Sequence, residues 1–151
     1  MRLSSVFLIS CAILVITGQA SAEKKSMMIG KDTQLLASVI VDTILSQQSP
    51  QVVLNPSVIN LAVNSEMLPE YCLLNATGVF DAGDFELKPG TLVCVAEDKR
   101  ILEAVVKGRF EGLASCEDCT QFKLMSGTQL KLSLENDVLL QLQIRADGQA
   151  Q

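Results

Sequence analysis

Two stretches near the C-terminus alternate between apolar and polar residues, a pattern typical of β-strands with one face in water. Every second residue of Thr128–Glu135 is leucine from Leu130 onward, and apolar residues alternate with polar ones in Val138–Arg145. Asn136-Asp137 lies between the two stretches and suits a tight turn. The pattern therefore predicts an antiparallel hairpin with one solvated face.

Similar patterns occur earlier in the chain. Thr91–Ala96 and Ile101–Lys107 flank the charged tetrapeptide Glu97–Arg100, which predicts a second hairpin. Tyr71–Phe80 has the composition of a strand, and we expect an interruption at Gly78.

Two segments are harder to assign. Leu35–Ile44 has apolar residues at helical spacing, but its many β-branched residues favour a strand. Asn55-Pro56-Ser57 supplies a helix cap followed by proline, so we expect a short helix over Pro56–Met67. Short strands separated by Gly, Pro, Asn and Asp predict a mostly β fold, either a small β-barrel or a sandwich of antiparallel hairpins with one short helix.

The first residues have the features of a secretory signal peptide. Arg2 gives a basic start, Val6–Gly18 is apolar, and Ala20-Ser21-Ala22 is a small-residue exit. The apolar part is shorter than the roughly 20 residues of a membrane-spanning helix. Leu8–Cys11 resembles a lipoprotein cleavage box, but the apolar run continues past Cys11, so we expect no lipid there.

These observations predict a simple organisation for an exported chain. We expect a signal peptide at 1–22, a polar tail at 23–30, a single β domain at 31–145 and a C-terminal tail at 146–151. No other apolar stretch is long enough to span a membrane, so no direct membrane span is expected.

Composition removes several classes of function. The chain has no His, which excludes Ser-His-Asp triads, Cys-His pairs and His-based metal sites. It has no Trp, its net charge is −5, and loss of Arg2 with the signal peptide makes the charge −6. Such a chain lacks the basic patch and stacking platform of a nucleic-acid binder. We expect no enzyme activity, cofactor, metal or small-molecule substrate.

Cys72, Cys94, Cys116 and Cys119 remain after removal of the signal peptide. An even number of cysteines in an exported chain predicts two disulfides, for which three pairings are possible. Spacing favours a local Cys116–Cys119 pair, which leaves Cys72 and Cys94 as the other partners.

Cys116-Glu-Asp-Cys119 also has the spacing of a redox motif. The two acidic residues between its cysteines raise thiol pKa values, which favours a structural disulfide over thiol–disulfide exchange. A four-cysteine metal site with Cys72 and Cys94 is a third interpretation, disfavoured because exported thiols oxidise.

Other polar groups offer weaker signals. Asp81, Asp84 and Glu86, or Glu97 and Asp98, are candidate carboxylate or calcium sites, but they lack the ligand spacing of a calcium loop and suit solvated turns better. Asn75-Ala76-Thr77 matches the short glycosylation sequon.

The order of these segments resembles the C-terminal periplasmic domain of the TraB/TrbI family, the central scaffold of conjugation and type IV secretion machines. The resemblance covers roughly Ile29–Leu140. Its distinctive part is Cys72, Cys94 and Lys107-Gly108, and it implies a cross-strand Cys72–Cys94 pair. Its other matching positions are Leu68-Pro69, Gly78, Asp84, the Leu92–Val95 strand, Asp98, Leu102-Glu103, Gly112, the Ile29–Ile40 opening and the Leu124–Thr128 turn.

The chain also departs from that family. It has a cleavable signal where the scaffolds carry a membrane helix and a Pro-rich stretch, and Gly112–Phe122 is too short for their channel-forming insertion. The resemblance therefore implies an assembling barrel-like domain without a pore.

Together these features predict a non-catalytic, exported structural subunit, periplasmic and associated with an outer-membrane complex of the secretion or conjugation type. Its expected partners are other envelope proteins and copies of itself, in contact with whichever of 128–135 or 138–145 is the outermost strand. Two alternatives remain: a periplasmic adaptor or chaperone that pairs by strand addition, and a redox protein that uses Cys116 and Cys119.

Overall fold

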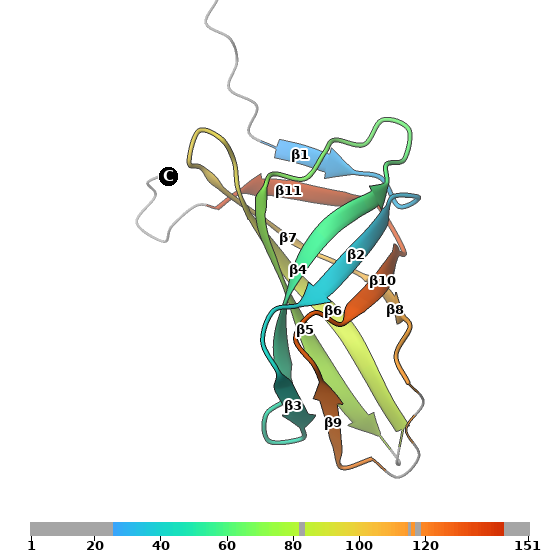
Figure 1. Cartoon of the computed structure of the whole chain (residues 1–151). Coiled ribbons are helices and arrows are strands. Elements are labelled where there is room, and N and C mark those ends of the chain that lie inside the picture. Colours follow the sequence, from blue (N-terminus) through green and yellow to red (C-terminus); the bar gives the residue numbers. More distant parts are fainter. Residues whose placement is uncertain (1–25, 82–83, 115, 117–118, 144–151) are drawn as a thin grey trace, which may run out of the picture.

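The computed structural model describes residues 26–81, 84–114, 116 and 119–143 (Figure 1). Within these ranges the chain forms strands and no helix. The strands are β1 (Ser26–Ile29), β2 (Gln34–Val39), β3 (Thr43–Ser46), β4 (Gln51–Asn60), β5 (Tyr71–Asp81), β6 (Asp84–Val95), β7 (Ile101–Val105), β8 (Gly108–Glu111), β9 (Gln121–Leu124), β10 (Gln129–Leu134) and β11 (Val138–Leu142).

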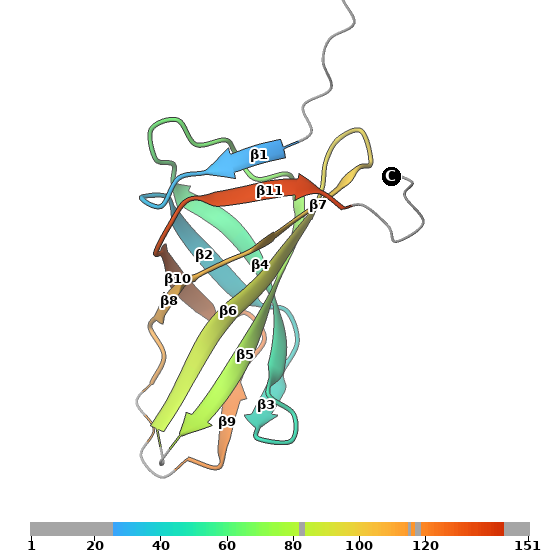
Figure 2. The same cartoon turned by 180° about the vertical axis from the view of Figure 1, so that it is seen from behind.

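Among the described residues, nine strands form one antiparallel sheet in the order β1-β11-β7-β6-β5-β4-β2-β10-β8. The sheet curls into a half-barrel, which brings β8 close to β6 (Figures 1 and 2). β3 and β9 form a separate two-stranded ribbon at the end of the molecule where β5 ends and β6 begins. The predicted mostly β fold is confirmed.

Alternating side chains fill the inside of this curl. Leu130, Leu132 and Leu134 of β10 are buried, as are Val138 and Leu140 of β11. The core consists almost entirely of Leu, Val, Ile, Ala and Cys, and Thr33 is its one buried polar residue within the described part of the chain. The alternation predicted for both C-terminal strands is therefore correct.

The predicted pairing of those two strands with each other is wrong. β10 lies between β2 and β8, whereas β11 lies between β1 and β7, so neither is an outermost strand. The Asn136-Asp137 turn connects β10 to β11, which lie on opposite sides of the β5–β6 pair in the strand order. Asp137 Oδ1 accepts a 2.8 Å hydrogen bond from the Lys31 amide. Local alternation identifies a strand but carries no information about its partner.

The predicted β6–β7 hairpin is confirmed, with Val95 opposite Ile101. The short helix expected over Pro56–Met67 is absent, because Pro56 continues β4 opposite Ala37 of β2. Val52, Leu54 and Pro56 point inward at strand spacing. Pro56 lacks an amide hydrogen, and β4 stops pairing with β5 at Leu54.

Two further boundaries differ from expectation. β5 runs through Gly78 without a break, where a Cβ would approach the Phe85 ring to 2.8 Å. The irregularity lies instead at Asn75, where the β5–β6 register shifts. The predicted strand over Leu35–Ile44 is divided between β2 and β3.

The N-terminal part of the sheet begins inside the segment expected to be a polar tail. Ser26–Ile29 forms β1, and Ile29 is fully buried. The predicted signal peptide at 1–22 and the predicted tail at 146–151 lie outside the described residues.

Both cysteine pairs lie at disulfide distance. Cys72 and Cys94 are direct partners across β5 and β6, with Cα atoms 4.1 Å apart. Cys116 and Cys119 have Cα atoms 5.7 Å apart in the loop between β8 and β9. The pairing favoured by spacing is the one observed.

Replacing Cys72 and Cys94 together by Ala should lower the free energy of unfolding by about 3 kcal/mol, because the pair closes a long loop in the unfolded chain. Denaturant titration of the oxidised proteins measures the difference. The matched Cys116→Ala, Cys119→Ala variant removes a disulfide that closes a much shorter loop, so its free energy of unfolding should fall by less. Equal losses in the two double variants would contradict the loop-length explanation.

Gly108→Ala should destabilise the fold by about 1–3 kcal/mol, as overpacking does. A Cβ at this position would overlap the carbonyl oxygen of Ser133 on the paired strand β10. Thermal unfolding should show a lower Tm for this variant and an almost unchanged Tm for Arg109→Ala, whose side chain is exposed. A wild-type Tm for Gly108→Ala would show that β8 is not held against β10 as described.

Candidate interaction surface

The carboxylates singled out from the sequence lie near two strand junctions, β5–β6 and β6–β7. Asp81 at the end of β5 lies opposite Asp84 at the start of β6, and Glu86 forms a 3.2 Å ion pair with Lys88. In the described part of the chain, no three His, Cys, Asp or Glu side chains are close enough to share a metal ion. Asp81, Asp84, Glu86, Glu97 and Asp98 are all exposed.

Asp98 in the β6–β7 turn has a structural partner. The Arg100 amide donates a 3.2 Å hydrogen bond to Asp98 Oδ1, and the Arg100 guanidinium binds Oδ2. The backbone hydrogen bond from Arg100 is the main reason that the pKa of Asp98 lies below its ordinary value, and the guanidinium adds to the effect. The Asp98 charge is thus neutralised within its own turn.

A different feature dominates the outside of the sheet. No Lys, Arg, Asp or Glu occurs in Thr43–Ser65, Tyr71–Phe80 or Pro89–Ala96. These runs contain β4, most of β5 and the second half of β6, which are neighbours in the sheet. Their outward side chains form one surface, here called the neutral face: Gln51, Val53, Asn55, Tyr71, Leu73, Asn75, Thr91 and Val93.

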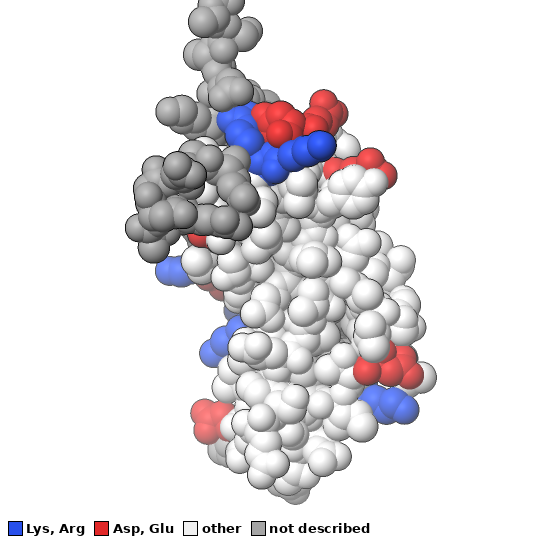
Figure 3. Space-filling view, turned by 90° about the vertical axis from the view of Figure 1, so that its left-hand side faces the viewer, with Lys and Arg blue, Asp and Glu red and all other residues white. Residues whose placement is uncertain are grey.

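The neutral face leaves apolar side chains in water. Leu73 is 50% exposed, Val53 is 47% exposed and Tyr71 is 68% exposed. Figure 3 shows the side of the molecule where β4 and β5 lie, with a wide uncharged middle and the charged side chains at its margins. Exposed apolar side chains gathered on one uncharged face are characteristic of protein contact sites.

The surface is shallow. Two hollows of about 420 Å³ each share Gln51, Val53 and Leu73, and neither is lined by a charged residue. Direct cross-strand partners hold the side chains in place: Val53 lies opposite Asn75, and Leu73 lies opposite Val93. Such a face can pack against another sheet or an extended segment, but it offers no enclosed space for a small molecule.

Asn75 lies within the neutral face at the point where the β5–β6 register shifts. Its Oδ1 atom is buried and has no hydrogen-bond partner. The amide therefore gains little from its position in the strand.

Sequence reasoning missed this surface because it looked for charged and catalytic groups. The signal was the absence of charge in three separate runs, which becomes meaningful only when the strand order places them side by side. Nothing in the described chain forms a helix that is long and apolar enough to cross a membrane.

Comparison with known proteins leaves the family open. The chain matches no protein-family model, and no curated protein matches its sequence. The resemblance to the TraB/TrbI domain stays a prediction.

Asn75→Thr should raise the free energy of unfolding by about 0.5–1 kcal/mol, because it removes an unpaired buried acceptor and suits a strand better. Chemical denaturation at neutral pH measures the change. Asn55→Thr, an exposed site on β4, serves as the matched control for strand propensity alone. A loss of stability at Asn75 would mean that its amide has a partner in solution.

Proposed function

We propose that this chain is a non-catalytic, exported structural subunit of a cell-envelope assembly of the secretion or conjugation type. The observation that carries the proposal is the neutral face, an uncharged surface of outward side chains on three adjacent strands. The signal-like start and the resemblance to the TraB/TrbI domain support export and an envelope location.

The proposed contact is made by the sheet face. Partner β domains or further copies of this chain cover Val53, Leu73 and Tyr71, which removes their apolar area from water at about 25 cal/mol per Å². The acidic chain repels other acidic surfaces, so association is favoured where charge is lacking.

Strand addition is less well supported. At the β1 edge, Glu66 already forms hydrogen bonds with the backbone groups of Met28. The Met28 amide donates to Glu66 Oε1 over 3.1 Å, and the Glu66 amide donates to the Met28 carbonyl over 2.9 Å. At the opposite edge of the sheet, the curl brings β8 close to β6. The redox interpretation of Cys116 and Cys119 is also less well supported. Both residues between these cysteines are acidic, whereas a reactive thiolate is stabilised by a nearby positive charge.

The test compares Leu73→Lys with Leu139→Lys in the tagged chain, expressed in the cells that make it. Both leucines are exposed to a similar extent, 50% and 48%, but Leu139 lies on β11, outside the neutral face. Each variant should keep its stability within about 0.5 kcal/mol. Leu73→Lys should cut the recovery of stoichiometric partners from solubilised envelopes at least about tenfold, which corresponds to 1.4 kcal/mol of binding free energy.

Two results would contradict the proposal. One is a wild-type chain that is a monodisperse monomer and recovers no stoichiometric partner from envelopes. The other is equal recovery by Leu73→Lys and wild type.

A further inference from the structure

A second surface feature lies where β5 begins and β6 ends. It is a cleft of about 770 Å³, here called the apolar cleft. One wall is the segment leading into β5, the other is the β6–β7 turn, and β1 contributes one side chain. Its apolar lining residues are Met27, Met67, Leu68, Pro69, Tyr71, Val95 and Ala96.

The walls of the apolar cleft are held in place by the fold. Leu68 and Ala96 pack against the hydrophobic core from opposite walls, and Tyr71 lies opposite Val95 at the base. Two backbone hydrogen bonds of 2.9 Å close the turn, from the Ala96 amide to the Arg100 carbonyl and from the Lys99 amide to the Ala96 carbonyl. The cleft is therefore formed before any partner arrives, which reduces the entropic cost of binding.

The lining leaves apolar side chains in water. Met67 is 63% exposed, and Tyr71 is more than half exposed. Methionine side chains adapt their shape to different apolar partners, and tyrosine supplies a large contact area with little conformational freedom to lose.

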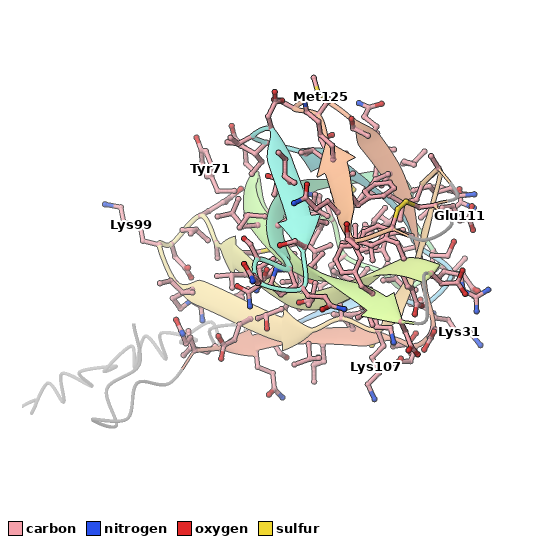
Figure 4. All side chains as sticks on the ribbon, turned by 90° about the horizontal axis from the view of Figure 1, so that it is seen from below. Lys31, Tyr71, Lys99, Lys107, Glu111 and Met125 are labelled. Atoms are coloured by element: carbon pink, nitrogen blue, oxygen red, sulfur yellow. A yellow bond between two sulfur atoms is a disulfide. The ribbon has the colours of Figure 1, made fainter. Side chains whose placement is uncertain are left out.

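The charged residues at the mouth of the apolar cleft determine which charge a ligand should carry. Glu70, Glu97, Asp98 and Lys99 line this mouth. Arg100 already compensates Asp98, whereas Glu70 and Glu97 form no ion pair within the described residues. Lys99 has a left-handed backbone (φ 68°), and in Figure 4 its side chain points away from the body of the molecule. Uncompensated carboxylates next to an apolar floor favour an apolar ligand that carries a positive charge.

From this geometry we infer that the apolar cleft binds a segment of a partner protein that carries apolar side chains next to a Lys or Arg. The apolar side chains lie against Met67, Tyr71 and Val95, and the cationic group lies between Glu70 and Glu97. An anionic membrane surface fits less well, because the same carboxylates repel it. Tyr71 belongs to both the neutral face and the apolar cleft, but the inference does not depend on the proposed role of the neutral face.

Two fluorescent peptides of about ten residues test the inference, with the same apolar residues but with two lysines in one and two glutamates in the other. Fluorescence anisotropy with the purified mature chain should give at least about tenfold tighter binding of the lysine peptide, an advantage that shrinks as salt screens the charges. Equal affinity for the two peptides, or no binding of either, would overturn the inference.

Variants locate the site. The double variant Glu70→Lys, Glu97→Lys should reverse the preference between the peptides, whereas Glu86→Lys, Glu135→Lys changes the net charge equally at distant exposed positions and should keep it. Met67→Ser, a single exposed change that removes apolar contact without altering the charge, should weaken binding of the lysine peptide at least about fivefold with an unchanged Tm. The same loss in the distant control would assign the preference to overall charge and reject the site.

Two further measurements separate other occupants. Leu73→Lys should bind the lysine peptide as wild type does, so failure of the neutral face and failure of the cleft are distinguishable. A chain truncated after Gln143 should also bind as wild type does. If the peptide binds only after this truncation, the cleft belongs to the chain's own C-terminal segment and the inference is wrong.

Discussion

The pairing of β5 with β6 joins the two branches of the sheet. From β6 the sheet continues through β7 and β11 to β1, and from β5 it continues through β4, β2 and β10 to β8. The disulfide between Cys72 and Cys94 fixes the register at one end of this pairing. A slip of one residue would move every inward side chain to the outside, so this register determines both the core and the outer surface.

The neutral face follows directly from that register. On β5, Leu74 and Ala76 are fully or nearly fully buried, while Leu73 between Cys72 and Leu74 points into water. A strand that is apolar on both faces is typical of a sheet covered on both sides. Here the inner side is covered by the curl of the sheet, and the proposed partners would cover the outer side.

Much of the fold could be predicted from local patterns. The alternation of Leu130, Leu132 and Leu134, the β6–β7 hairpin and the cysteine pairing are all encoded within short segments or by spacing. The partners of β10 and β11 could not be predicted, because alternation is the same whichever strand lies alongside. Asn55-Pro56 carried a helix-capping signal that lost to the inward series Val52, Leu54 and Pro56. The two candidate surfaces depend on strand order, so neither was accessible from the sequence alone.

The position of β1 has a kinetic consequence. Its partner in the sheet is β11, so the first and last strands of the described chain are neighbours, with Ile29 opposite Val138. Contacts between residues so far apart in sequence raise the contact order and form late, because closing a long loop costs entropy before the contact is made. The sheet therefore cannot be completed until the residues up to Leu142, the end of β11, have been synthesised. A chain that ends before Val138 would leave β1 without its partner and Ile29 without cover, and such an open strand is prone to pair with other chains.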